Sequence, residues 1–414
     1  MSDSADSLLE SRLLLSAAGL ETLVNSHTLG SQVQPAIASD ADGDYVVVWA
    51  SQQDGSSYGI YAQRFNAAGV PQGSEFRVNT HTTNSQSHPE VAMDAVGNFV
   101  VVWNSDGQDG SDIGVYAQRY DASGTPLGGE FRVNTETNGA QRDPHVAIDA
   151  DGDAVVVWYS DGQDGGGFGV YGQRFNSSGF QGGEFLVNTT TGGNQALADV
   201  AIDTNGNFVV AWHSFGQDGS GYGIYAQRFD ASGVAQGVEF RVNTTTANQQ
   251  TRPSVGMDEN GDFVVAWEST AQDGSSDGIY AQRFTSTGIF AGSEFLVNTY
   301  TTAAQRNPSV SMDASGDFVV VWESYAQDGD FEGIYAQRYN SIGTPRGSEF
   351  RVNSTTNEVQ NIPVVTLDSD GDFVIAWESF STDGSGYGIY TQRFRENHLE
   401  YSGIWRSGQF YLDS

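Results

Sequence analysis

Short apolar runs without helical spacing recur along this chain. In one stretch they occupy Pro89–Met93, Asn98–Trp103, Gly114–Tyr120 and Glu130–Asn134. The run Phe99–Trp103 is apolar at every position, which is typical of a strand buried on both faces. Between the first two runs, Asp94–Gly97 is short enough for a tight hairpin turn. Helical periodicity is nearly absent after the first 20 residues. The pattern therefore predicts an all-β protein built from four-stranded antiparallel units.

These units repeat along the chain. A tryptophan closes the second run of each copy, at steps of 54 or 55 residues, at Trp49, Trp103, Trp158, Trp212, Trp267, Trp322 and Trp377. A unit of this size cannot bury its own sheet, so neighbouring copies must pack together. We predict a seven-bladed β-propeller over residues 21–394, with each Trp anchoring the core between blades. An open solenoid, a string of small sandwiches and a sugar-stacking role for the Trp residues are the alternatives.

The predicted fourth strands indicate how the ring closes. They begin at a glutamate and occupy Glu75–Asn79, Glu130–Asn134, Glu184–Asn188, Glu239–Asn243, Glu294–Asn298 and Glu349–Asn353. A seventh copy, Glu21–Asn25, precedes the first blade, and the last blade lacks one at the usual distance. We expect residues 21–25 to complete the last blade, which removes an exposed sheet edge. Residues 409–412 resemble a degenerate fourth strand and are the rival.

The two ends of the chain depart from the repeat. Residues 1–20 form a predicted N-terminal arm, in which Leu8, Leu9, Leu13 and Leu20 can line one side of a short helix. Residues 395–414 form a C-terminal tail of open role. The arm carries acids where a secretory signal needs basic residues, and no apolar run approaches the about 18 residues that span a bilayer.

A charged pair recurs in every copy. Arginine ends the third strand at Arg64, Arg119, Arg174, Arg228, Arg283, Arg338 and Arg393. Glutamate opens the fourth strand at Glu21, Glu75, Glu130, Glu184, Glu239, Glu294 and Glu349. We predict one cross-strand Arg–Glu pair per blade, worth about 0.2–1 kcal/mol. The alternative is an arginine ring that binds an anionic ligand.

Net charge restricts the partners. The formal charge is -34, and all 18 basic residues are arginine. Such a field repels nucleic acid and anionic lipid, so we expect neither nucleic-acid binding nor membrane insertion. The chain has no cysteine, which leaves the compartment open.

Acids cluster in the first turn of three copies. The residues are Asp40, Asp42, Asp44, Asp149, Asp151, Asp153, Asp368, Asp370 and Asp372. Oxygen ligands at alternate positions suit Ca²⁺, and these turns resemble the calcium loops of integrin-type propellers and EF-hands. They depart from that pattern because Gly falls one place early and no later bidentate Glu follows. Calcium is the predicted cofactor, and an Asp that caps a tight turn is the alternative.

A Gln-Asp-Gly loop follows the second strand, with Thr replacing Gln in the last copy. Its acids are Asp54, Asp109, Asp164, Asp218, Asp273, Asp328 and Asp383. Strand direction places this loop on the same face as the polar crossover to the next blade. A variable position lies nearby, at Tyr58, Ile113, Phe168, Tyr222, Asp277, Glu332 and Tyr387. Aromatic rings beside acids can hold a sugar, so the seven Asp residues with Tyr58, Phe168, Tyr222 and Tyr387 are the predicted ligand-binding residues. Loop architecture is the alternative.

Catalysis finds little support in the sequence. An active site needs a unique constellation, whereas nearly every polar feature here recurs in each copy. The six histidines show no metal-ligand spacing. We therefore predict a protein without enzymatic activity and name no catalytic residue.

The repeated string V-V-x-W-x-S-x-x-Q-D-G-S-x-x-G-I-Y-A-Q-R-F, continued to E-F-x-V-N-T, resembles tandem repeats of large bacterial secreted or cell-surface, adhesin-like proteins. The resemblance implies an extracellular propeller but no assigned ligand. We predict a lectin-like module that recognises a polysaccharide, another glycan or a surface protein, with several weak sites on one face favouring avidity. The alternatives are a rigid spacer in a surface layer, matrix or larger adhesin, and a carbohydrate-active enzyme whose nearest candidate is the last blade. The oligomeric state is left open.

Overall fold

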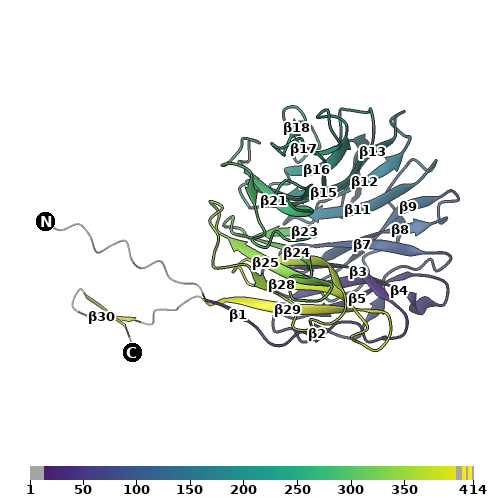
Figure 1. Ribbon diagram of the computed structural model, residues 1–414. Coiled ribbons are helices and arrows are strands. Elements are labelled where there is room, and N and C mark those ends of the chain that lie inside the picture. Colours follow the sequence, from purple (N-terminus) through teal and green to yellow (C-terminus); the bar gives the residue numbers. More distant parts are fainter. Residues whose placement is uncertain (1–13, 398–402, 407–408, 413–414) are drawn as a thin grey trace.

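Seven antiparallel sheets surround a central axis in the computed structural model, which describes residues 14–397, 403–406 and 409–412 (Figure 1). Six sheets have four strands, and the seventh has five because the N-terminal segment joins it. The chain is thus an all-β, seven-bladed propeller, as the repeat predicts, and the solenoid and sandwich alternatives are wrong. No helix in the described part of the chain is long and apolar enough to cross a membrane.

Each blade is a meander of four strands that runs outward from the axis. The first, innermost strands are β3 (Gln32–Ser39), β7 (Gln86–Met93), β11 (Gln141–Ile148), β15 (Gln195–Ile202), β19 (Gln250–Met257), β23 (Gln305–Met312) and β27 (Gln360–Leu367). The second strands are β4 (Tyr45–Ser51), β8 (Phe99–Asp106), β12 (Ala154–Asp161), β16 (Phe208–Phe215), β20 (Phe263–Thr270), β24 (Phe318–Tyr325) and β28 (Phe373–Phe380).

The outer half of each blade is less regular. The third strands are β5 (Gly59–Phe65), β9 (Ile113–Tyr120), β13 (Phe168–Asn176), β17 (Tyr222–Phe229), β21 (Asp277–Phe284), β25 (Glu332–Tyr339) and β29 (Tyr387–Asn397). The fourth strands are β6 (Phe76–Arg77), β10 (Phe131–Arg132), β14 (Gly179–Leu186), β18 (Phe240–Arg241), β22 (Phe295–Leu296) and β26 (Phe350–Arg351). A 3₁₀ turn, η1 (Gln52–Asp54), follows β4.

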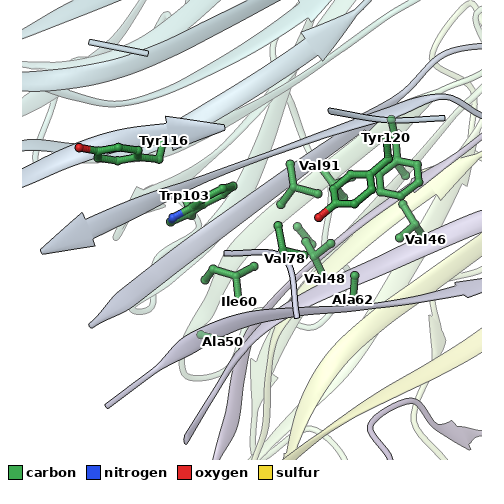
Figure 2. Close-up of a cluster of buried hydrophobic side chains, with 14 residues drawn as sticks. Val46, Val48, Ala50, Ile60, Ala62, Val78, Val91, Trp103, Tyr116 and Tyr120 are labelled. Carbon is green, nitrogen blue, oxygen red and sulfur yellow. The ribbon is translucent and has the colours of Figure 1, made fainter. Parts of the chain in front are cut away.

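The core lies between blades rather than within them. Trp103 of the second blade is fully buried and packs with Ala50, Ile60 and Val78 of the first blade (Figure 2). All seven repeat tryptophans have 0% exposure. This confirms them as core anchors and excludes direct sugar stacking, since each large apolar surface is removed from water at a blade interface.

The N-terminal segment closes the ring. In β2 (Thr22–Leu23), Thr22 lies opposite Thr391 and Leu23 opposite Tyr390, the register that Phe76 and Arg77 adopt in the first blade. The prediction that residues 21–25 complete the last blade is confirmed. The rival is wrong, because β31 (Gln409–Leu412) pairs with β30 (Gly403–Arg406) in a separate hairpin.

An additional strand, β1 (Leu14–Ala17), pairs with the end of β29. The helix expected for the arm is therefore wrong for these four residues. Leu8, Leu9 and Leu13 lie outside the described residues, and Leu20 is 88% exposed.

The predicted Arg–Glu pair within each blade is wrong. Glu75 accepts hydrogen bonds from the backbone N–H and hydroxyl of Ser26, at 2.7 and 2.9 Å. Register explains the difference: Ala62 lies opposite Phe76, so Glu75 falls beside Gln63, and the next side chain, Arg64, points to the other face of the sheet.

The arginines instead connect neighbouring blades. Arg228 donates to the carbonyl of Thr287 at 3.0 Å, and Arg174 donates to that of Ser232 at 2.6 Å. Equivalent bonds join Arg64 to Ser123, Arg119 to Asn176, Arg283 to Ile342 and, across the ring closure, Arg393 to Ala67. Arg338 forms an ion pair with Glu396 of the last blade. The arginine at this position is therefore a clamp between blades.

Candidate ligand-binding site at the centre of the ring

A bulge interrupts every innermost strand at the same place. The register of β7 shifts between Ser87 and Glu90, and corresponding shifts occur in the other six blades. The bulged residue has a positive φ of 47–57° although none is glycine: Gln34, His88, Asp143, Leu197, Arg252, Asn307 and Ile362. Proline follows it in six of the seven blades. Such backbone conformations are uncommon for non-glycine residues and are typical of functional sites.

The bulges surround a cavity of about 580 Å³ at the axis of the ring. All seven bulged residues line it, together with side chains two positions further along the same strands. Because the bulge lies near the start of each innermost strand, the cavity lies toward the face that carries the Gln-Asp-Gly loops, here called the Gln-Asp-Gly face. At the bulged position the repeat loses its uniformity, since each blade contributes a different side chain there.

In four blades, the residue after the repeat tryptophan supports the bulge of the following blade. Glu268 accepts the backbone N–H of Asn307 at 2.7 Å, and Glu323 accepts that of Ile362 at 3.2 Å. Glu378 likewise accepts the N–H of Gln34. Burial raises the pKa of all three carboxyl groups, that of Glu378 to about 7. Three adjacent blades thus place a buried acid directly behind the cavity wall.

An acid–histidine–acid cluster spans three consecutive blades on another side of the cavity. His145 Nδ1 lies 3.1 Å from Asp199 Oδ1 and 3.9 Å from Glu90 Oε1. Asp199 is fixed by the backbone N–H groups of Val200 and Val255, both at 2.8 Å. Asp199 therefore orients the imidazole, as a carboxylate does for a working histidine.

The cluster shifts two pKa values in the same direction. Burial would lower the pKa of His145, but its hydrogen bond to Asp199 and the charges of Asp199 and Glu90 outweigh burial and raise the pKa to about 9. Burial raises the pKa of Glu90 to about 7, against the opposing charge of His145. The two carboxyl groups therefore favour the protonated form of His145.

None of the four predicted aromatic residues lines the cavity; they lie at or just before the start of the third strands, in an outer layer here called the rim. The rings of Tyr222 and His213 are tilted, with centroids 4.3 Å apart, and the ring centroid of Phe168 lies 5.1 Å from that of Tyr159. His213 and Tyr159 occupy the position after the tryptophan, next to the bulges. Burial, with a smaller effect of Arg252, lowers the pKa of His213 to about 4. The rings are half-buried, so each offers part of one surface to a ligand.

The other variable positions differ in chemistry. Tyr387 packs against Phe380 at 5.0 Å, and Asp277 forms an ion pair with Arg306 at 2.8 Å. Ile113 and Glu332 begin their third strands at the same place. Three blades therefore place a non-aromatic residue at the rim: Ile113 is apolar, and Asp277 and Glu332 are acidic.

The Asp and Gln side chains of the Gln-Asp-Gly loops form hydrogen bonds within their own blade. Asp54 Oδ1 accepts the N–H of Ser56 at 3.0 Å, and Gln53 donates to Glu75 at 2.6 Å. The acids repeat this bond to the N–H two residues on, at Asp109, Asp164, Asp218, Asp273, Asp328 and Asp383. The loops lie against the crossovers, where Ser220 donates to the carbonyl of Asn248. The predicted Asp residues therefore lie one per blade, and each accepts a hydrogen bond within its own loop.

The acidic first turns use their leading carboxylate as a cap. Asp40 Oδ1 accepts the N–H groups of Asp42 and Asp44 at 3.0 and 2.9 Å. Asp149 caps Asp151 and Asp153, and Asp368 caps Asp370 and Asp372, in the same way. Among the described residues, no group of three or more His, Asp or Glu side chains is arranged to hold a metal ion. Calcium binding at these turns stays a prediction.

The residues that line the cavity were not predicted from the sequence. The recurring residues carried the prediction, whereas Glu90, His145 and Asp199 each occur once at equivalent positions of adjacent copies. The available signal was divergence: in strands that otherwise repeat, the residue before the proline changes from copy to copy, as in Gln34-Pro35 and His88-Pro89.

Comparison with known proteins supports the fold. No protein-family model and no curated protein matches the chain. A solved protein of unknown function from Dyadobacter fermentans superposes with a TM-score of 0.55 at 10% identity, covering 92% of this chain and 99% of that one. An endo-arabinase from Bacteroides thetaiotaomicron gives a TM-score of 0.37 at 14% identity, covering 61% and 93%. The chain is thus similar, at the level of fold, to a bacterial protein of the same overall extent.

Proposed function

We propose that the protein is a non-enzymatic carbohydrate-binding module whose site is the central cavity and its aromatic rim on the Gln-Asp-Gly face. One observation carries the proposal. The rings suited to sugar stacking lie in the layer around a cavity that polar and apolar side chains line together, and to which every blade contributes a different bulged residue. Stacking on the rim and hydrogen bonds in the cavity are the two contacts by which proteins hold saccharides.

The size and polarity of the cavity suit a small saccharide. Its volume of about 580 Å³ falls within the usual range for ligand sites. Gln34, Asn307 and Ser254 offer neutral donors and acceptors along its wall. Charged groups at Arg252 and His145 add stronger hydrogen bonds to hydroxyl or ring oxygens.

The setting that we propose is extracellular or at a bacterial cell surface. The support is the resemblance of the repeat to adhesin-like tandem repeats, together with a surface charge that keeps an exposed protein hydrated. A polysaccharide or a glycosylated surface protein is the proposed partner. The seven Gln-Asp-Gly loops would add weak contacts to neighbouring sugar units, with Ca²⁺ as a proposed stabiliser of the first turns.

A glycan array, probed with the purified protein in millimolar Ca²⁺ and again in chelator, tests the proposal. We expect binding to a defined glycan, lost when Tyr387 or Tyr222 is changed to Ala. Phe290→Ala is the matched control, because this half-exposed ring lies in the loop between the third and fourth strands, on the opposite face. Absence of binding in both buffers would favour the rigid-spacer alternative, and loss only in chelator would assign a role to calcium.

A second function, acid–base catalysis on the bound saccharide, is favoured by the cluster of Glu90, His145 and Asp199. A carboxyl group with a pKa near 7 can donate a proton to a leaving oxygen. The test is release of reducing ends from each glycan that binds. Release that disappears in Glu90→Gln would support catalysis, and binding without release supports a module that only binds.

A further inference from the structure

We infer that the saccharide carries an ammonium group and that this group binds beside Glu378, at the position that the Arg252 guanidinium occupies beside Glu268 in the fifth blade. The inference rests on the proposed carbohydrate-binding function and specifies its ligand as an amino sugar in the free-amine form.

Glu378 is a buried carboxylate without a cationic partner. It follows Trp377 on β28 and is 3% exposed. Its hydrogen bond is to the backbone N–H of Gln34 in the first blade, and no Arg or His among the described residues lies within ion-pair distance of it. A buried carboxylate is costly unless a positive charge compensates it. Glu378 is therefore a position where a cation is stabilising.

The repeat itself shows where that cation belongs. In the fifth blade, Glu268 occupies the position of Glu378, and the bulged residue Arg252 places its Nε 3.5 Å from the carboxylate. The bulged residue of the seventh blade is Ile362, which cannot supply a charge. The place taken by a guanidinium in the fifth blade thus has no protein cation in the seventh.

Tyr387 lies on the same face of the blade as Glu378. In the pairing of β28 with β29, Glu378 lies opposite Ile389 and Phe380 lies opposite Tyr387, so these side chains project from one face of the sheet. Burial, and with it the charge of Glu378, raises the pKa of Tyr387. Tyr58 packs instead in the cluster between the first and second blades. A carboxylate beside an aromatic ring can bind an ammonium group through charge and cation–π attraction.

Glu378 lies directly behind the cavity wall, in a favourable field. Ile362 and Gln34 line the cavity, and Gln34 donates its backbone N–H to Glu378. At the equivalent place of the fifth blade, Arg252 lines the cavity and contacts Glu268 at the same time. Glu323 of the sixth blade adds a second negative charge nearby. A net charge of -34 attracts cations over longer range. An ammonium on a hydroxylated ring would place its charge at Glu378 and its ring toward Tyr387.

Three tetrasaccharides that differ at one carbon test the inference by calorimetry: β-1,4-linked glucosamine, its N-acetylated form and the glucose form. We expect the amine to bind at least ten-fold more tightly than the other two. Glu378→Gln should remove that preference. Ile362→Arg, which supplies the cation from the protein as Arg252 does, should do the same while leaving the fold intact by circular dichroism.

The control separates a site from general attraction between opposite charges. Glu259→Gln removes the same charge from an exposed turn on the opposite face and should leave the preference unchanged. Equal binding of all three tetrasaccharides would overturn the inference and leave the proposed function standing. An equal effect of Glu259→Gln would overturn it as non-specific attraction. Failure of every glycan on the array would overturn the proposed function itself.

Discussion

At the scale of single residues, the carboxyl groups behind the cavity make stability depend on pH. The pKa of Glu378 rises from 4.5 to about 7 on folding because burial disfavours the ion. The native state then holds this proton more tightly than the unfolded chain does. Stability contributed by the protonated group is full below about pH 4.5 and is lost as the pH rises to about 7.

We therefore expect the wild-type protein to lose more stability between pH 4.5 and pH 8 than Glu378→Gln does. The difference should be about 3 kcal/mol, since each pKa unit corresponds to about 1.4 kcal/mol. Urea unfolding at the two pH values measures it. Identical pH dependence of the two proteins would show that Glu378 is ionised as easily in the fold as in water.

The tryptophans permit a second test at this scale. Trp267→Ala removes a fully buried side chain from the interface of the fourth and fifth blades and should cost about 3–5 kcal/mol. Trp267→Phe should cost much less, because the indole Nε1 has no hydrogen-bond partner among the described residues. Denaturant midpoints of the two variants give the comparison. Equal losses would indicate that the indole nitrogen is bonded in solution.

At the scale of strands, ring closure depends on the pairing of β2 and β1 with β29. Removing residues 1–25 would expose the edge of β29 and uncover the partners of Leu23 and Val24. Loss of these two apolar side chains should cost about 3 kcal/mol and promote association through the open edge. Removing residues 1–13 leaves both strands and is the matched control. Thermal unfolding and light scattering distinguish the two, and equal behaviour would contradict closure by β2.

Strand order, blade number and closure could be predicted because they follow from the repeat and from apolar runs, which are local signals. The Arg–Glu pair could not, because it depends on register: Phe76 lies opposite Ala62, so Glu75 and Arg64 project from opposite faces of the blade. The cavity residues were hidden for another reason. Glu90, His145 and Asp199 lie about 54 residues apart in sequence and meet only when three consecutive blades pack together.

At the scale of the whole molecule, self-repulsion opposes folding. The -34 charge acts over about 30 Å at 0.01 M salt and over about 8 Å at 0.15 M. We expect the thermal midpoint to rise as NaCl increases over this range. Millimolar CaCl₂ should raise it further than NaCl or MgCl₂ of equal ionic strength if the Asp40, Asp149 and Asp368 turns bind calcium. Equal midpoints would leave these turns as capped hairpins.

The bulged positions also bear on how such a ring acquires new partners. All seven bulges share one backbone conformation, and in four blades the residue after the tryptophan of the preceding blade also holds the bulge by a hydrogen bond. Glutamine, histidine, aspartate, leucine, arginine, asparagine and isoleucine are all accommodated there. The side chain at each of the seven bulged positions can therefore be substituted separately without a change in the fold. In this respect the propeller resembles an immune receptor, in which variability is confined to a few positions and the scaffold is left unchanged.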